Sequence, residues 1–189
     1  MIMDIFEQKK VLESMTVLVD NREQPTKRAE ERYKLFGSPY ERATLSYGDY
    51  TYNAMLPTGK PLFDTSKTIE PLLAVERKMN LDELAYCFTH SRDRFQREFE
   101  RATANKAQIF LLVENASWEN LLNGKYRSRF NAKAFEASVL AWSIRYGLQI
   151  IFCKEETSGI LIHDILYRDL KERLERGEFD GETARESAS

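Results

Sequence analysis

The segment that most constrains the fold is the apolar run at residues 72–75, LLAV, which leads directly into Glu76-Arg77-Lys78. A continuous apolar run of this kind predicts a strand, over residues 71–76, in the middle of a sheet that is covered on both faces. Side chains two positions apart on an extended chain point to the same side. We therefore expect Glu76 and Lys78 to lie together at the end of this strand.

Strand and helix patterns alternate along the rest of the chain. Runs of β-branched and apolar residues predict strands at 16–20, in two segments of 42–55, and at 107–113 and 148–153. Helical spacing of apolar residues predicts helices at 26–35, 80–103 with a break near Ser91, 118–122, 131–146 and 159–176. This order predicts an α/β fold, with a mixed central β-sheet flanked by helices, in a single domain.

Two local signals refine these elements. Gly48 lies between the two strand segments of 42–55, where a glycine allows a bulge or a close approach of the backbone to another group. Asn80 is suited to cap the helix that follows it, with Glu83 at the third helical position as in a capping box.

The chain divides into an expected arm, domain and tail. We expect residues 1–15 to form an N-terminal arm, 16–176 the folded domain, and 177–189, where the composition turns small and polar, a disordered tail. With 189 residues, 42% of them hydrophobic, the chain can bury a sizeable core. No segment approaches the roughly 20 apolar residues that span a bilayer, so we expect a soluble, cytoplasmic protein. Cys87 and Cys153 belong to no metal-binding pattern and are expected to be buried thiols.

The charges are nearly balanced, with 28 basic and 30 acidic side chains and a net charge of −2. This balance excludes nucleic-acid binding through wholesale positive charge, so such a contact requires a local basic surface. Candidates are Arg92, Arg94, Arg97 and Arg101 on one expected helix, and Lys125, Arg127 and Arg129, which alternate with Tyr126 and Phe130 in an expected loop. The alternative is a solvated helix face on which the arginines pair with Glu98 and Glu100.

Acidic residues in three segments can supply a site for a divalent metal. Asp49 follows a glycine, Glu76 ends the central strand, and Asp20 and Glu23 flank a turn. Mg²⁺ prefers oxygen ligands and is usually held by one or two carboxylates, so Asp49 and Glu76 suffice, and Asp20 and Glu23 can complete the shell. A bound metal can activate water and neutralise charge in the hydrolysis of a phosphodiester.

The charged neighbours of this site have roles that the residues alone leave open. Lys78 can orient or deprotonate the attacking water, or it can stabilise charge on the phosphate. Arg22 and Arg77 are suited to bidentate contacts with phosphate. Asp82 either points back to the site from the following helix or favours the dipole at the start of that helix.

These motifs resemble those of a known family. Gly48-Asp49 followed by Glu76-Arg77-Lys78, with three residues between Lys78 and Asp82, is similar to the GD…ERKxxxD signature of the XPF/Mus81 family of structure-specific endonucleases, which carry an ERCC4-type nuclease domain. Residues 17–23 resemble the opening strand of that domain. Residues 91–95 resemble its segment with an Arg-Phe or Arg-Tyr pair after the first helix.

The resemblance implies a restriction-endonuclease-like fold of the PD-(D/E)XK class, dependence on Mg²⁺ or Mn²⁺, and cleavage of branched, flap or fork DNA. The metal positions of the family fall on Asp20, Glu23, Asp49 and Glu76, and its catalytic positions on Asp49, Glu76, Arg77 and Lys78. The DNA contacts we expect are Arg22, Arg77, Arg94, Arg97, Lys125 and Arg127, with Asp82 supporting the metal site.

Some features of the family are missing, and they leave alternatives. Family members usually carry tandem helix-hairpin-helix domains that grip DNA and pair two subunits, and no such segment follows residue 160. The preferred DNA structure and a homodimer through the nuclease domain therefore stay open. A standalone nuclease domain is more typical of phage or bacterial proteins. The alternative functions are a junction resolvase or end-processing exonuclease of the same fold class, and a DNA-binding module without turnover.

Overall fold

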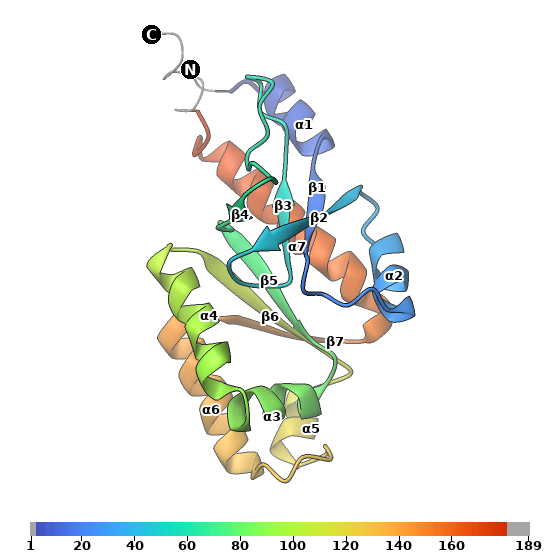
Figure 1. Ribbon diagram of the computed structural model, residues 1–189, viewed down its shortest axis with the longest axis vertical. Helices are drawn as coiled ribbons and strands as arrows, with labels where there is room; N and C mark the ends of the chain where they lie inside the picture. The colour runs from blue at the N-terminus through green and yellow to red at the C-terminus, as the bar shows by residue number, and fades with distance from the viewer. Residues whose placement is uncertain (1–2, 181–189) are drawn as a thin grey trace.

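The computed structural model describes residues 3–180 of the chain. Within this range seven strands form one mixed sheet in the order β4-β2-β1-β3-β5-β6-β7 (Figure 1). The strands are β1 (Thr16–Asp20), β2 (Tyr40–Leu45), β3 (Tyr50–Asn53), β4 (Thr68–Ile69), β5 (Leu73–Lys78), β6 (Gln108–Glu114) and β7 (Gln149–Cys153). β3 is antiparallel to its neighbours β1 and β5, whereas the other pairs are parallel. The predicted α/β fold with a mixed sheet is confirmed.

Helices cover both faces of the sheet. In the described part of the chain they are α1 (Ile5–Glu13), α2 (Lys27–Lys34), α3 (Leu81–Thr89), α4 (Arg92–Ala104), α5 (Trp118–Leu122), α6 (Ala132–Tyr146) and α7 (Glu155–Glu175). α7 packs against α1, α2 and strands β3, β5 and β6, while α3, α4 and α6 pack together on the opposite face. Figure 1 shows α1 near the top of the molecule, α2 at mid-height on the right, α4 on the left, α3, α5 and α6 in the lower part, and α7 crossing behind the sheet.

The strand β5 lies between two separate hydrophobic cores, as its continuous apolar run predicted. Leu73 and Val75 enter a core that includes residues of α1, α2 and α7, and Ala74 enters a second core formed with α3, α4 and α6. Because side chains alternate along a strand, the same pattern continues into the charged triplet. Arg77 therefore lies on the first face, and its two charged neighbours lie on the second.

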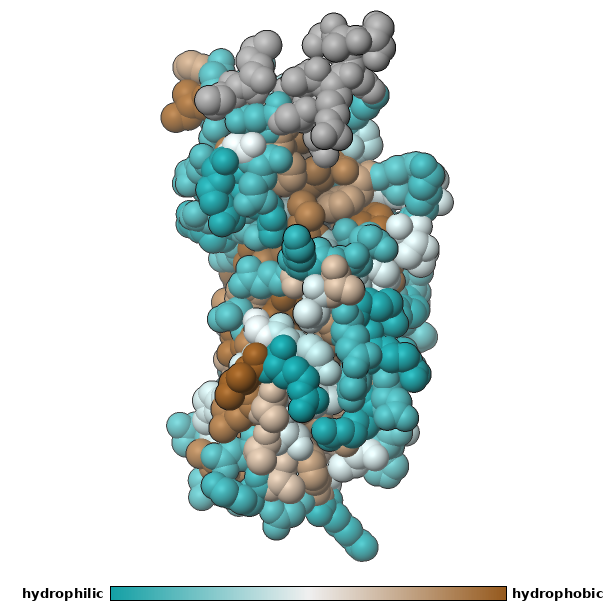
Figure 2. All heavy atoms as spheres, turned by 90° about the vertical axis from the view of Figure 1, so that its left-hand side faces the viewer, coloured by the Kyte–Doolittle hydropathy of each residue, from teal (hydrophilic) through white to brown (hydrophobic). Residues whose placement is uncertain are grey.

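A third, smaller core lies on β1, β2 and β4. It is formed by Leu18, Ala43, Leu45 and Ile69, with Phe63 from the loop between β3 and β4 packed against it. Figure 2 shows hydrophobic side chains exposed in the upper half of the face that it presents. The loop at 54–67 thus contributes to the interior of the domain.

Gly48 makes the close approach that its position predicted. Its φ angle is +75°, and a Cβ atom at this position would lie 2.6 Å from the Cβ atom of Ala74. A glycine is required because its backbone is in the left-handed region and in contact with the neighbouring strand. The turn before β3 is thereby held against β5.

The start of α3 follows the predicted capping box only in part. The Asn80 side chain accepts a hydrogen bond from the N–H of Glu83, at 2.9 Å. The Glu83 carboxylate accepts from the N–H of Met79, at 2.6 Å, and so does not complete the box at Asn80 itself. The predicted helix break is present, since α3 ends at Thr89 and α4 begins at Arg92.

The last helix begins earlier than its predicted start at Gly159. α7 starts at Glu155, so Gly159 lies inside the helix. A Cβ atom at Gly159 would lie 2.4 Å from the carbonyl oxygen of Arg32. This glycine allows α7 and α2 to pack closely, and that long-range contact is the reason why it does not mark a helix boundary.

The two ends of the described chain are part of the folded body. α1, which falls in the predicted arm, packs against α7. In the predicted tail, Phe179 is buried in the first core, and the Asp180 carboxylate accepts a hydrogen bond from the N–H of Met3 at 2.9 Å. Packing thus continues past residue 176, and the rest of the predicted tail, 181–189, lies outside the described residues. No helix within residues 3–180 is long and apolar enough to cross a membrane.

Candidate active site

A cavity of about 270 Å³ lies where the end of β5 and the turn before β3 meet helices α3 and α4. Its lining combines acidic, basic and aromatic side chains: Arg22, Asp49, Glu76, Lys78, Glu83, Tyr86, Cys87, Ser91, Arg94, Phe95 and Glu98. Asp49, Glu76 and Lys78 come from two of the segments that carried the sequence motifs. The structure brings these three predicted catalytic residues together.

Backbone hydrogen bonds hold Asp49 between two strands. Its N–H donates to the carbonyl of Val75 at 2.9 Å, and its carbonyl accepts from the N–H of Asp20 at 2.8 Å. Its carboxylate accepts from the N–H of Arg77 at 2.8 Å. Together with the close packing of the preceding glycine, these bonds fix the carboxylate beside β5.

Lys78 and Glu76 form an ion pair in the cavity, and both residues are buried. Burial by itself would lower the pKa of Lys78, but the carboxylates of Glu76 and Asp49 raise this pKa above its ordinary value. Lys78 is therefore protonated at neutral pH. Burial, together with repulsion from Glu76, raises the pKa of Asp49 well above its usual range. Two carboxylic groups thus share one ammonium group in this cavity.

Glu98 is a cavity residue that the sequence placed on a solvated helix face. Its side chain, on α4, is 12% exposed and lies 3.5 Å from Arg22 and 4.0 Å from Arg94. Burial, followed by repulsion from Glu76, raises the pKa of Glu98. The sequence signal for this position was its spacing of three residues from the apolar Phe95, which puts both side chains near the same inward face of the helix.

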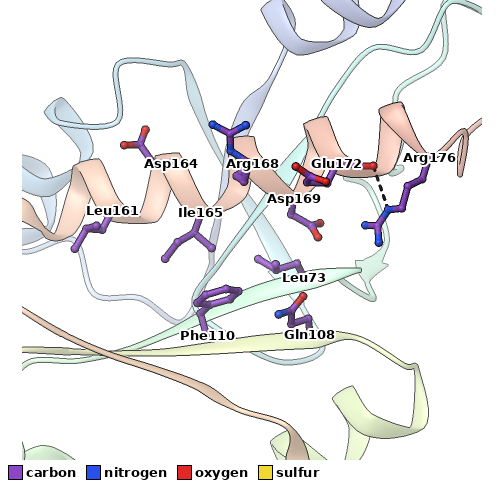
Figure 3. Close-up of a pocket in the computed structure, with 10 residues that line it drawn as sticks. All are labelled: Leu73, Gln108, Phe110, Leu161, Asp164, Ile165, Arg168, Asp169, Glu172 and Arg176. Atoms are coloured by element: carbon purple, nitrogen blue, oxygen red, sulfur yellow. Dashed lines mark hydrogen bonds between the residues drawn. The ribbon is translucent and has the colours of Figure 1, made fainter.

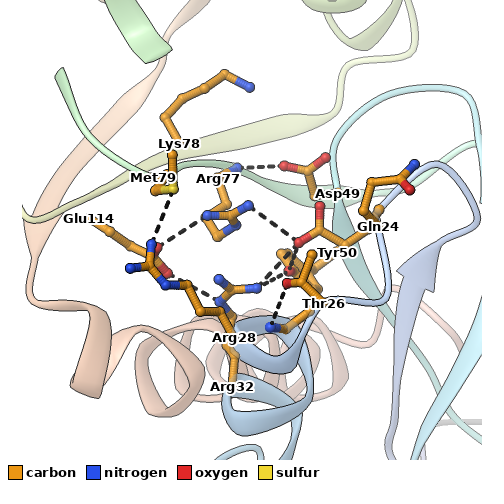
Figure 4. Close-up of polar contacts among 12 residues, drawn as sticks. Gln24, Thr26, Arg28, Arg32, Asp49, Tyr50, Arg77, Lys78, Met79 and Glu114 are labelled. Carbon is orange, nitrogen blue, oxygen red and sulfur yellow. Dashed lines mark hydrogen bonds and ion pairs between the residues drawn. The ribbon is translucent and has the colours of Figure 1, made fainter. Parts of the chain in front are cut away.

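A closed network of charges surrounds the Arg77 side chain on the other face of β5. Glu23 and Glu114 each bind both Arg32 and Arg77, at N–O distances of 3.1 to 3.3 Å. Tyr50 donates a hydrogen bond to Glu23 at 2.9 Å and accepts one from Arg32 at 3.0 Å. Figure 4 shows the Arg77 guanidinium within this group, while Lys78 extends away from it. We refer to Glu23, Arg32, Arg77 and Glu114 as the buried network.

Three residues predicted to bind metal or take part in catalysis have side chains that do not line the cavity. Glu23 and Arg77 are held in the buried network. Asp20 is buried, and its carboxylate accepts from the N–H of Arg22 at 2.7 Å and from the N–H of Leu45 at 2.8 Å. A metal-binding role for Asp20 and Glu23, and a catalytic or DNA-binding role for the Arg77 side chain, stay predictions drawn from the family resemblance.

The other predicted DNA contacts are divided between the cavity and the surface. Arg22 and Arg94 line the cavity, whereas Arg97, Lys125 and Arg127 lie outside it, on α4 and on the loop before α6. The Asp82 carboxylate accepts hydrogen bonds from two backbone N–H groups of this loop, those of Arg127 and Ser128, both at 2.7 Å. Asp82 thus anchors a basic loop, a contact over more than 40 residues that the motif spacing did not predict.

The donor atoms of the cavity fit a hard divalent cation. No group of three or more His, Cys, Asp or Glu side chains within residues 3–180 is already arranged to hold a metal. Asp49 and Glu76 nevertheless offer carboxylate oxygens, which suit Mg²⁺ and Mn²⁺, and a bound cation would relieve the repulsion that raises the Asp49 pKa. The nearby Cys87 is a neutral thiol, because burial raises its pKa to about 11. Oxygen donors therefore dominate the site.

A larger cavity, of about 530 Å³, lies on the first face between α7 and strands β5 and β6. Figure 3 shows Leu73 and Phe110 facing α7 across it. Asp169 in its wall already accepts hydrogen bonds from Tyr52 at 2.8 Å and from Arg173 at 2.7 Å. Its lining also includes Asp164 and Glu172. Because its floor is apolar and none of the predicted catalytic or metal-binding residues lines it, this cavity is a weaker candidate for phosphate chemistry than the smaller one.

Known proteins match this chain in sequence family and in fold. Residues 19–164 match the family described as the ERCC4 domain. The structure of XPF from Aeropyrum pernix is similar with a TM-score of 0.58 at 18% identity, over 87% of this chain and 69% of that one. A structure described as XPF from Aeropyrum pernix in complex with DNA is similar with a TM-score of 0.56 at 21% identity, over 84% of this chain and 66% of that one. Comparison with curated protein sequences gave no match.

Proposed function

Since the chain belongs to the ERCC4 domain family, as its motifs predicted, we propose that it is a metal-dependent DNA endonuclease. The observation that carries this proposal is the meeting of Asp49, Glu76 and Lys78 in one cavity. Two carboxylates and a lysine can supply what phosphodiester hydrolysis requires, namely a cation-binding pair and a positive group for the charge that develops. The proposed substrates are branched, flap or fork DNA.

Asp49 and Glu76 are the proposed ligands of Mg²⁺ or Mn²⁺. When bound, such a cation lowers the pKa of a coordinated water and neutralises charge on the phosphate. The contribution of the chain is to keep the carboxylates in place, because the Arg77 N–H holds Asp49 and the strand β5 carries Glu76. Glu98, on the α4 wall, adds negative charge that attracts a cation to the cavity.

Lys78 acts as a protonated group in this proposal. Its raised pKa keeps the ammonium charged at neutral pH, which suits it to stabilise charge on the phosphate rather than to remove a proton from water. The Lys78 Nζ atom also lies 5.2 Å from the centre of the Phe95 ring, a cation–π contact that orients the ammonium.

Arg22 and Arg94 are the proposed contacts to the DNA backbone beside the scissile bond. Their side chains line the cavity and are 48% and 72% exposed. The Arg94 guanidinium can bind a phosphate through two parallel hydrogen bonds. The Arg22 guanidinium already binds Asp20 and the Leu45 carbonyl, so its contribution is mainly its positive charge. The structure described as XPF in complex with DNA supports DNA as the ligand of this fold.

A junction resolvase or an end-processing exonuclease of the same fold class would use the same groups, because the metal chemistry is shared. A DNA-binding module without turnover is less well supported, since the acidic pair and the lysine are all present in the cavity. A homodimer through the nuclease domain is a further part of the proposal. Sedimentation velocity with and without DNA tests it, and a monomer under both conditions would exclude it.

A cleavage panel tests the proposed activity. Wild type, Asp49→Asn, Glu76→Gln and Lys78→Met would be incubated with Mg²⁺ or Mn²⁺ on 3′-flap, fork, four-way junction, plain duplex and single-stranded DNA. Lys133→Met removes an exposed lysine of α6 and is the matched control.

We expect metal-dependent cutting of a branched substrate by wild type and control, with loss in the three cavity variants. Release of terminal nucleotides alone would favour the exonuclease. No cutting of any DNA with either metal would overturn the enzyme proposal, and unchanged cutting by the variants would overturn the site.

A further inference from the structure

Tyr86 lies between the candidate active site and another cavity, which is separate from the one beside α7. We call it the second cavity. Its side chain, on α3, is 55% exposed. The second cavity, of about 660 Å³, is lined by the far side of α3 and by the loop that carries Arg127 and Arg129. Tyr86 and Glu83 line both cavities. A ligand that leaves the active site in this direction must pass over Tyr86.

The second cavity has an exposed aromatic platform. The rings of Tyr86 and His90, one helical turn apart, are stacked with centroids 4.7 Å apart and planes 8° apart. Thr89 Oγ1 lies 2.8 Å from His90 Nδ1 and donates its own proton to the Ala85 carbonyl at 2.8 Å. With the Thr89 proton assigned to the Ala85 carbonyl, the matching tautomer has Nδ1–H as the donor to Thr89, and this contact orients the imidazole ring.

The basic side of the second cavity has a fixed backbone and two arginine side chains. Asp82 binds two N–H groups of the loop, and Tyr126 donates a hydrogen bond to the Phe130 carbonyl at 2.8 Å. The rings of Tyr126 and Phe130 both pack on Phe135, so they anchor the loop and are not a platform for bases. Within residues 3–180 neither Arg127 nor Arg129 forms an ion pair, although Asp82 and Glu83 also line the cavity.

The geometry points to a subsite for an unpaired nucleotide of the DNA substrate, next to the scissile phosphate. The base would stack on the free face of the Tyr86 ring, whose other face lies against His90, and its phosphate would bind Arg127 and Arg129. A duplex does not fit this role, because its paired bases present no free face to a protein aromatic group. This inference rests on the proposed nuclease function. It explains why the enzyme would prefer DNA with single-stranded branches over plain duplex.

A fluorescence binding experiment tests the subsite without requiring cleavage. The catalytically impaired Lys78→Met protein would be titrated with a flap DNA that carries 2-aminopurine at single positions in the flap. Stacking on an aromatic side chain quenches this base. We compare it with the additional substitutions Tyr86→Leu, which removes the ring, Tyr86→Phe, which keeps it, and Lys133→Met as a control.

We expect quenching at flap positions close to the junction, which Tyr86→Leu abolishes and Tyr86→Phe retains. Affinity for flap DNA should fall by about tenfold in Tyr86→Leu, while affinity for plain duplex stays unchanged. Arg127→Ala with Arg129→Ala should weaken flap binding and reduce its salt dependence. Circular dichroism checks that each variant is folded.

The possible outcomes distinguish failure of the subsite proposal from failure of the nuclease proposal. Unchanged quenching in Tyr86→Leu, or an equal loss of affinity for flap and duplex, would overturn the subsite even if the wild type cuts flap DNA. Absence of cleavage by the wild type, with Tyr86-dependent quenching, would overturn the nuclease proposal and leave the binding subsite standing. No binding of flap DNA would overturn the subsite.

Discussion

The candidate active site and the buried network use the same kinds of charged side chain, on opposite faces of one strand, in different ways. In the buried network each of the two glutamates binds both arginines, so charge is balanced and enclosed. In the cavity, the pKa of Asp49 and the pKa of Glu98 are both raised by burial and by neighbouring carboxylates. A balanced cluster stabilises a fold, whereas an excess of carboxylates favours a bound cation.

This difference gives neighbouring residues different roles. Glu76 and Lys78 lie in the cavity, and the Arg77 side chain between them lies in the network. Arg77 also links the two regions, because its backbone N–H holds the Asp49 carboxylate. Substitutions in the cavity should therefore remove activity, and substitutions in the network should remove stability.

The largest effect is expected from removing the cavity lysine. Lys78→Met should lower single-turnover cleavage by on the order of 10³-fold, because a positioned proton donor or positive group contributes about 10²- to 10⁴-fold. Lys133→Met should leave the rate unchanged. A rate within about tenfold of wild type would show that Lys78 has no role in the chemistry.

The next largest effect is expected in the buried network. Arg32→Met leaves Glu23 and Glu114 with one guanidinium between them, and should lower the free energy of unfolding by about 3 to 5 kcal/mol. Urea denaturation measures this change, with the exposed Lys34→Met of the same helix as control. A loss of less than about 1 kcal/mol would mean that the network behaves like a surface ion pair.

A smaller effect is expected at the turn that positions Asp49. Gly48→Ala should cost about 2 kcal/mol, because it combines a strained φ with a collision at Ala74. Gly37→Ala is a matched control, since Gly37 has a φ of +67° but a Cβ atom there would meet nothing within 4 Å. The difference between the two costs, measured by thermal unfolding, reports the contact. Equal losses of stability in Gly48→Ala and Gly37→Ala would mean that the contact with Ala74 does not contribute.

The smallest expected effect is a gain in stability, on replacement of Asp49. The ionised Asp49 is disfavoured in the folded state because its pKa is raised there, so Asp49→Asn should stabilise the metal-free protein by about 1 kcal/mol near pH 8. The advantage of the variant should shrink as pH falls and wild-type Asp49 takes up a proton. Thermal unfolding of both proteins in EDTA between pH 5 and pH 8 measures this dependence. If Asp49→Asn were less stable than wild type at pH 8, the raised pKa of Asp49 would be contradicted.

Local patterns predicted most of the fold and the core of the site. The apolar run before Glu76 identified the central strand, and the glycine before Asp49 identified the close turn. The network could not be predicted in this way, because Arg32 and Glu114 are separated by 82 positions and no local pattern pairs them. Glu23, which the family resemblance assigns to the metal site, is held by partners from three other elements, and its metal-binding role stays a prediction.

Mn²⁺ binding, followed by electron paramagnetic resonance, tests the division between the two regions most directly. Wild type, Asp49→Asn and Glu23→Gln would be titrated under conditions where circular dichroism shows all three to be folded. We predict that wild type and Glu23→Gln bind Mn²⁺ with similar affinity and that Asp49→Asn loses the site. Loss of binding in Glu23→Gln with retention in Asp49→Asn would contradict the assignment of the metal to the cavity.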